Sequence, residues 1–231
     1  MNISLYYQEK GEGIPFVLLH GNGESGDYFE NQIEYFSNKF RMIAVDTRGH
    51  GKSQRGTAPF TMNQFVEDLN MLLEKIDVNN IILLGFSDGA NIAIKFALKY
   101  PDKIKALILN GADLDTKGVK RTTQIPIEIG YRLAKLFENK SDDAKKNAEI
   151  LGLMVNEPNI KVESLHSINI PTLVIAGKKD LIKEKHTRLI AENIKGAELS
   201  IIDGNHFIAS KHPKEFNQEV DRFLNKVIDN N

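Results

Sequence analysis

Short apolar runs and amphipathic stretches alternate along the chain. Most of the runs are rich in Val, Ile and Leu, and they occupy residues 3–8, 16–19, 41–45, 81–84, 106–109, 172–176 and 199–202. Apolar residues recur at helical spacing in the stretches 61–76, 88–100, 183–194 and 213–227. Continuous apolar runs, in contrast to alternating ones, indicate strands that are covered on both faces. The pattern therefore predicts the α/β class, with a mostly parallel sheet and helices on both of its faces.

Turn residues mark two of the element boundaries. Gly11 and Gly13 lie between the first two apolar runs, which predicts that these two strands pair directly through a glycine turn. Pro101 follows the amphipathic stretch 88–100, and a residue that precedes a proline disfavours the helical conformation. We therefore expect the helix to end there.

A segment of about 60 residues before the sixth run has no strand signal, and structureless loops of that length are uncommon in compact domains. We predict a small helical insertion with helices at 127–138 and 141–155, the second of them capped by Ser141. Apolar residues of this insertion recur at helical spacing and are predicted to pack on the core: Ile129, Leu133, Leu136, Phe137 and Met154. The predicted domains are a core made of residues 1–115 and 167–231 and a helical lid at 116–166.

Composition and charge exclude several classes of function. The chain has 231 residues, 41% hydrophobic and 26% charged, which suits one compact domain. Thirty basic and 31 acidic residues give a net charge of −1, so we expect neither a nucleic acid nor an anionic membrane as partner. The sequence contains no cysteine, which excludes disulfides, thiolate metal sites and a cysteine nucleophile.

The sequence shows no targeting signal. The first ten residues, MNISLYYQEK, lack the basic and then apolar segments of a secretory leader. The apolar runs are also far shorter than the ~18 residues that a membrane span requires. We therefore expect a cytoplasmic protein.

Residues 85–89, GFSDG, lie between a predicted strand and a predicted helix. This is the G-x-S-x-G pattern of a nucleophile elbow in its strand–turn–helix context. A serine at so sharp a turn has strained backbone angles, and glycines two residues away allow the chains to approach. Ser87 is therefore the candidate nucleophile, at the carboxyl edge of the sheet. The alternative is a glycine-flanked serine that caps a helix.

A serine hydroxyl is a weak nucleophile unless an oriented base accepts its proton. His206 directly follows the last predicted strand, and Asp180 follows the strand before it, so both are expected at the same sheet edge as Ser87. Asp113, which follows a third strand, is the rival acid. The order Ser87, Asp180, His206 is the order associated with this elbow. Two other histidines, on or beside polar helices, are predicted to be surface residues: His186 and His212.

Acyl transfer also requires N–H groups that stabilise the developing oxyanion. The elbow itself supplies the backbone N–H of Asp88. The sequence HGNG at 20–23 follows a buried strand and forms a glycine-rich turn, so we place the second donor on the backbone of Asn22, with Gly23 as the next candidate.

Five motifs in this order make the chain resemble serine hydrolases of the α/β-hydrolase fold. HGNG at 20–23 is similar to the oxyanion turn of that family, DTRGHGKS at 46–53 to its D-x-R-G-x-G-x-S loop, and GFSDG at 85–89 to its elbow. Asp180 and His206 match the remaining triad positions. The resemblance covers nearly the whole chain and implies a core sheet of about eight strands with a lid inserted before the acid-bearing strand. It also implies that no metal or organic cofactor is needed.

These observations predict a serine hydrolase that cleaves a small ester-type substrate through an acyl-enzyme. The short lid favours a carboxylesterase for short to medium acyl chains, while lactonase, thioesterase, amidase and perhydrolase activities would use the same groups. A serine at the elbow excludes the relatives that use an aspartate nucleophile, the dehalogenases and epoxide hydrolases. Asp88 places a carboxylate beside the nucleophile, so the sequence leaves open which substrate charge the site prefers. The expected partner is a small acyl substrate, and the sequence predicts no oligomeric state.

Two other classes compete with this interpretation. Gly21, Gly23 and Gly26 follow a strand, and Asp46 ends the next strand, which is the spacing of a dinucleotide-binding motif and would indicate an NAD-dependent oxidoreductase. Acidic residues around these glycines oppose the approach of a pyrophosphate. A non-catalytic binding module of the same fold is the third class, and the presence of all three triad residues argues against it.

Overall fold

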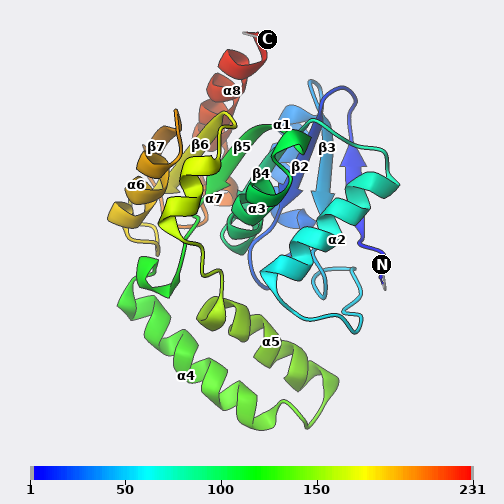
Figure 1. Ribbon diagram of the computed structural model, residues 1–231, viewed down its shortest axis with the longest axis vertical. Coiled ribbons are helices and arrows are strands. Elements are labelled where there is room, and N and C mark those ends of the chain that lie inside the picture. The colour runs from blue at the N-terminus through cyan, green and yellow to red at the C-terminus, as the bar shows by residue number, and fades with distance from the viewer. Residues whose placement is uncertain (1–2, 230–231) are drawn as a thin grey trace.

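The computed structural model describes residues 3–229 and contains one sheet with helices on both faces (Figure 1). Seven strands form the sheet in the order β1-β3-β2-β4-β5-β6-β7, and all neighbours are parallel except β1 and β3. The strands are β1 (Tyr7–Lys10), β2 (Pro15–Leu19), β3 (Arg41–Val45), β4 (Ile81–Phe86), β5 (Ile104–Asn110), β6 (Thr172–Gly177) and β7 (Glu198–Ile202). The predicted fold class is confirmed, with seven strands where the resemblance implied about eight.

The predicted pairing of the first two strands is wrong. β1 pairs antiparallel with β3, in a register that places Tyr7 opposite Val45, and β2 lies between β3 and β4. Gly11, with a φ of 86°, packs closely against the backbone carbonyls of Ser37 and Phe40. The glycine segment therefore crosses the start of β3 and does not close a hairpin. Glycines are found in both kinds of connection, so the turn signal in the sequence does not distinguish them.

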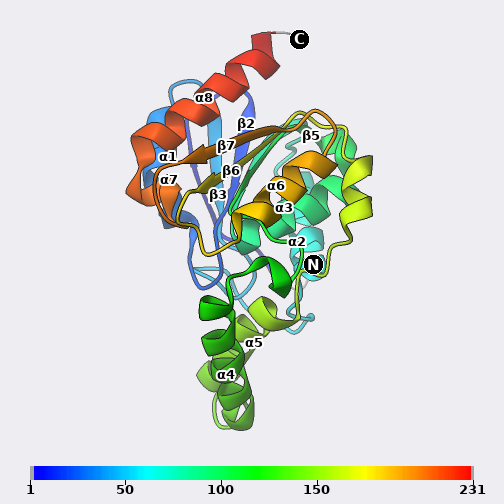
Figure 2. The same ribbon diagram turned by 90° about the vertical axis from the view of Figure 1, so that its left-hand side faces the viewer.

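Helices cover the sheet in two layers (Figure 2). One apolar cluster joins α2, α3 and α6 to one face, and a second joins α1, α7 and α8 to the other. Adjacent strand residues belong to opposite clusters, such as Val17 and Leu18, so the sheet is buried on both sides. The helices are α1 (Glu30–Phe36), α2 (Met62–Lys75), α3 (Asp88–Lys99), α4 (Arg121–Phe137), α5 (Asp142–Asn156), α6 (Glu184–Asn193), α7 (Ile208–Lys211) and α8 (Pro213–Asp229). None of the described helices is both long and apolar enough to cross a membrane.

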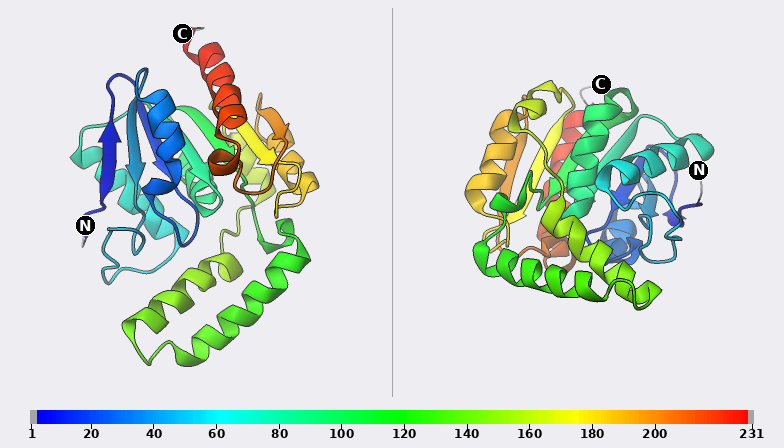
Figure 3. Two further views of the ribbon diagram at one scale, coloured as in Figure 1. Left: turned by 180° about the vertical axis from the view of Figure 1, so that it is seen from behind. Right: turned by 60° about the horizontal axis from the view of Figure 1, so that its bottom comes forward.

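α4 and α5 form an antiparallel hairpin that projects from the core (Figure 3). Ser141 caps α5 as predicted, because its hydroxyl accepts a hydrogen bond of 3.1 Å from the N–H of Ala144. The prediction that the apolar stripe packs on the core is wrong for four of its five residues, which are 46–75% exposed: Ile129, Leu133, Leu136 and Phe137. A two-helix hairpin offers α4 one partner helix, α5, so its opposite face stays in solvent.

Candidate active site

Ser87 lies at a sharp turn between β4 and α3. Its φ of 54° and ψ of −121° are sterically unfavourable for a residue with a side chain. A side chain on Gly85 would overlap the carbonyl of Gly89, and one on Gly89 would overlap the carbonyl of Leu19. The N–H of Ser87 donates a hydrogen bond of 2.8 Å to the carbonyl of Asn110. The turn therefore has the form of a nucleophile elbow, at the carboxyl end of the central strand.

Asp180 and His206 form a buried pair at the same sheet edge, on the loops after β6 and β7. His206 Nδ1 and Asp180 Oδ1 are 2.7 Å apart, and the N–H of Ile182 donates to the same oxygen at 2.9 Å. The imidazole lies between Phe86, at a centroid distance of 4.8 Å, and Gly111, where an added Cβ would be 2.7 Å from Cε1. These contacts fix the ring in position and leave Nε2 as the nitrogen that can serve Ser87.

Ser87 and His206 both contact the end of β5, at Asn110 and Gly111 respectively. Within the described residues no hydrogen bond joins the serine hydroxyl to the imidazole. Hydrogen bonds of this kind are often long before substrate binds. The structure thus brings the predicted nucleophile, base and acid to one edge of the sheet.

The other predicted acid, Asp113, has a different partner. Its carboxylate accepts a hydrogen bond of 2.9 Å from the side chain of Asn91, and its N–H donates to the same side chain at 2.9 Å. The histidine–carboxylate pair therefore selects Asp180. His186 was predicted to be a surface residue, but it is half-buried and its Nε2 accepts a hydrogen bond of 3.0 Å from Leu114 N–H.

The two predicted oxyanion donors lie on adjacent segments. Asp88 is the first residue of α3, and N–H groups of a first helical turn lack partners within the helix. The N–H of Asn22 donates no hydrogen bond within residues 3–229. Gly89 contacts the carbonyls of Leu19 and His20, so the start of α3 packs against the turn that holds Asn22. Both N–H groups are available for a substrate oxygen.

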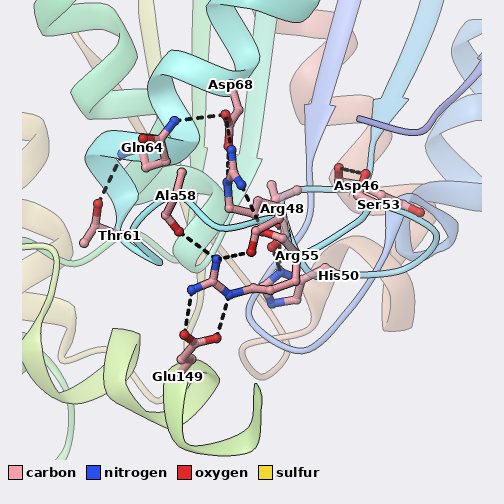
Figure 4. Close-up of polar contacts among 12 residues, drawn as sticks. Asp46, Arg48, His50, Ser53, Arg55, Ala58, Thr61, Gln64, Asp68 and Glu149 are labelled. Carbon is pink, nitrogen blue, oxygen red and sulfur yellow. Dashed lines mark hydrogen bonds and ion pairs between the residues drawn. The ribbon is translucent and has the colours of Figure 1, made fainter. Parts of the chain in front are cut away.

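The loop at 46–53 holds the structure around the site together. Asp46 accepts hydrogen bonds of 2.7 Å from the N–H groups of Gly26 and Lys52. Arg48 and Asp68 form a fully buried two-pronged ion pair, with N···O distances of 2.6 and 2.7 Å (Figure 4). The dinucleotide interpretation requires the Asp46 carboxylate to bind a ribose. Both of its oxygens instead accept hydrogen bonds from backbone N–H groups, which argues against that interpretation. These contacts give the loop at 46–53 a structural role.

Two histidines, His50 within this loop and His20 beside it, are held neutral by burial. Burial lowers the pKa of His50 to about 4, and the neighbouring His20 adds to the decrease. Burial also lowers the pKa of His20, whose Nε2 accepts a hydrogen bond of 3.0 Å from Thr47 N–H. Both rings therefore act as uncharged structural groups.

The structure reveals a small cavity beside Ser87 that gathers acidic side chains from separate segments. This cavity of about 30 Å³, which we call the closed cavity because it is more enclosed than the hollow beside His206, is lined by Ser87, Asp88, Asp113, Gln124 and Glu157, together with apolar side chains. Burial, followed by the charges of Asp113 and Glu157, raises the pKa of Asp88 to about 8. Burial likewise raises the pKa of Asp113 to about 7. The sequence places Asp88 beside the nucleophile and Asp113 at the same sheet edge, but it carries no signal for Gln124 and Glu157, which come from distant segments.

A second, open hollow of about 260 Å³ lies beside His206, and its lining also includes Asp180, Phe207 and Lys120. A larger groove of about 720 Å³ lies elsewhere, between α2, α3 and the turn Val162–Ser167, and contains none of the predicted site residues. The predicted chemistry therefore concerns the two smaller spaces that adjoin Ser87 and His206.

Known proteins resemble this chain over nearly all of its length. A family model described as the alpha/beta hydrolase fold matches residues 14–148. Serine hydrolase BPHL of Mus musculus is 28% identical, with 96% of this chain and 83% of the relative aligned. Bromoperoxidase from Bacillus anthracis is 25% identical with a TM-score of 0.83, and the match covers 96% of this chain and 95% of that one. A thermophilic esterase from Thermogutta terrifontis is 25% identical with a TM-score of 0.80, and covers 97% and 94%.

Proposed function

Since the chain belongs to the alpha/beta hydrolase fold family, we propose that it is a serine hydrolase that cleaves small ester-type substrates, a carboxylesterase. The observation that carries the proposal is the convergence of three loops: the strained elbow at Ser87 and the buried His206–Asp180 pair share one sheet edge. Relatives at 25–28% identity include a protein named as a serine hydrolase and another named as an esterase, which supports hydrolysis as the reaction class.

In the proposed reaction, Ser87 Oγ attacks the carbonyl carbon while His206 Nε2 accepts the hydroxyl proton. Asp180 holds Nδ1, which fixes the tautomer and stabilises the imidazolium that forms. His206 then donates the proton to the departing alcohol oxygen, which leaves an acyl group on Ser87. A water molecule that gives its proton to the same imidazole hydrolyses this acyl-enzyme and restores the serine.

The backbone N–H groups of Asn22 and Asp88 would stabilise the oxyanion of both tetrahedral intermediates. Charge develops on that oxygen only as the carbonyl carbon becomes tetrahedral, so these donors favour the transition state over the bound ester. Loss of one such donor typically costs about 3 kcal/mol of activation free energy. Lactones, thioesters and amides would be cleaved by the same steps, and acyl-pocket shape decides among them.

A substitution of the nucleophile tests the proposal. Ser87→Ala is expected to abolish turnover of p-nitrophenyl acetate and butyrate while the circular dichroism spectrum stays that of the wild type. A fluorophosphonate probe should label the wild-type protein and not the variant. A wild-type protein that is folded but neither labelled nor active on a panel of esters, thioesters and lactones would contradict the proposal and favour a binding module.

A further inference from the structure

The closed cavity beside Ser87 is acidic. Asp88, Asp113 and Glu157 contribute carboxyl groups to its wall, and within the described chain no lysine, arginine or histidine lines it. Lys95, which lies outside the wall, contacts Glu157 at 3.8 Å. A cavity needs roughly 10–15 Å³ to hold one water molecule, so a space of about 30 Å³ admits a small polar group.

Two buried oxygen atoms in this wall have no hydrogen-bond partner within the described residues. Oδ2 of Asp88 is one of them. The other is Oε1 of Gln124, a side chain that is only 6% exposed. The amide nitrogen of Gln124 donates to the carbonyl of Met154 at 3.3 Å, which leaves its oxygen for the cavity. Buried polar atoms without a partner are unfavourable. The amide oxygen of Gln124 can only accept, so the missing occupant is a hydrogen-bond donor.

The two spaces at the site divide the substrate between them. The open hollow contacts His206, which must protonate the leaving alcohol, but not Ser87. The closed cavity contacts Ser87 and Asp88, but not His206. An ester bound for the proposed reaction therefore directs its alcohol part toward the open hollow and its acyl part toward the closed cavity.

We propose that the acyl part of the substrate carries a primary or secondary amine on a short chain, and that this amine occupies the closed cavity. The proposal rests on the proposed serine hydrolase function and names its substrate class, aminoacyl esters. An ammonium group supplies donors to Asp88 Oδ2 and Gln124 Oε1, and its charge is complementary to the carboxyl groups of the wall. A water molecule in the cavity could also donate hydrogen bonds, but unlike an ammonium group it carries no charge that would stabilise the ionised form of these carboxyl groups.

The test compares two esters that differ only in the amine, alanine benzyl ester and propanoic acid benzyl ester. The amino ester is chemically more reactive, so each kcat/KM value is divided by the rate constant for hydroxide-catalysed hydrolysis of the same ester. For the wild type we expect the corrected value to be about tenfold to a hundredfold higher for the amino ester, the range of charge-assisted hydrogen bonds. Equal corrected values would overturn the proposal.

Variants locate the preference in the cavity. Gln124→Leu and Asp113→Asn should each reduce the ratio of the two corrected values by about tenfold, whereas Asp143→Asn, at an exposed position on α5, should leave the ratio unchanged. A parallel loss of both substrates, with the ratio preserved, would overturn the proposal. If a variant fails to fold, the wild-type comparison decides alone. Absence of activity on both esters together with absence of probe labelling would instead contradict the serine hydrolase function itself.

Discussion

The core site and the lid hairpin are built in different ways. At the elbow, Ser87 and the glycines around it are fixed by close backbone contacts with β2 and β5. The hairpin of α4 and α5 projects from the core and leaves an apolar stripe exposed on α4. Two polar contacts join α5 to the loops of the core: Asn22 Nδ2 donates to the carbonyl of Ile150 at 2.8 Å, and Arg55 pairs with Glu149 at 2.6 and 2.7 Å (Figure 4).

This difference indicates a division of labour between the two regions. The core determines the positions of the reacting groups, because a shift at the elbow would require movement of buried strands. The lid contributes Gln124 and Glu157 to the cavity beside Ser87, so it determines what the acyl part of a substrate contacts. Changes in the core should therefore affect kcat or global stability, whereas changes in the lid should affect substrate preference and local opening.

The largest expected effect is on the chemistry of the core. Asp180→Asn should lower kcat by about 10⁴-fold, about 5 kcal/mol, because an amide cannot stabilise the imidazolium and favours the wrong tautomer of His206. The measurement is steady-state hydrolysis of p-nitrophenyl butyrate. Asp143→Asn, the same change on the exposed face of α5, is the control and should retain wild-type kcat. A kcat within a factor of about ten of wild type would exclude Asp180 as the orienting acid.

Two glycine substitutions compare the packing of the two regions. Gly89→Ala should destabilise the protein by about 3 kcal/mol or more, because the new Cβ would overlap the carbonyls of Leu19 and His20. Gly130→Ala, inside α4, should stabilise it by about 0.5–1 kcal/mol, because the added Cβ would lie 3.8 Å from Leu151 and alanine favours the helix. Urea denaturation gives both free energies of unfolding. Similar values for the two variants would contradict the contrast between a close-packed core and an open lid.

Much of the core could be predicted from the sequence because its signals are local. The runs of Val, Ile and Leu give the strands, and the GFSDG pattern gives the elbow, since strained angles at Ser87 require glycines at fixed distances. His206 and Asp180 could be placed because loops after parallel strands emerge at one edge. The partner of β1 could not be predicted, because a glycine turn and a glycine crossing have the same local sequence.

The acidic cavity and the exposed stripe could not be predicted for a related reason. Gln124 and Glu157 lie on separate segments of the lid, and only the docking of the hairpin on the core brings them to Asp88 and Asp113. The helical spacing of the stripe on α4 shows that the helix is amphipathic, but spacing does not reveal whether its apolar face has a partner. Tertiary arrangement decides both features, and the sequence carries no independent signal for it.

The next effect is a pH dependence of stability that belongs to the core. Because the pKa of Asp88 rises from 3.8 to about 8 on folding, the folded state binds more protons than the unfolded state between these values. The free energy of unfolding contributed by Asp88 is therefore fully present below about pH 4 and is lost as the pH rises toward about 8. Asp88→Asn removes this loss. The free energy of unfolding of the variant, measured relative to that of the wild type, should therefore increase by at least about 1 kcal/mol between about pH 5 and pH 8.

Urea denaturation at the two pH values measures this gain. Asp113, whose pKa rises to about 7, keeps part of the pH dependence in the variant. Asp143→Asn on the exposed face of α5 should show no difference between the two pH values. A stability difference between Asp88→Asn and wild type that is the same at both values would show that Asp88 does not hold its proton in the folded protein.

The smallest expected effect concerns the attachment of the lid. Glu149→Gln removes the charge that pairs with Arg55, while Arg55 keeps its 2.7 Å hydrogen bond to the carbonyl of Ala58. Because both partners are partly exposed, at 28% and 19%, we expect a loss of about 1 kcal/mol or less, confined to the opening of the hairpin. Hydrogen exchange should then be faster in the amides of α5 and unchanged in β4.

Glu138→Gln is the matched control for this prediction. It breaks the 2.7 Å ion pair with Lys135 at the end of the hairpin, where neither partner joins the lid to the core. If the Arg55–Glu149 pair fastens α5, only Glu149→Gln should also raise KM for a neutral ester, by about two- to fivefold, with kcat retained. Equal acceleration of exchange in α5 and β4 would mean that the lid and the core open as one unit. In that case the lid could not change its substrate contacts without disturbing the elbow, and the separation of chemistry from selection would not hold.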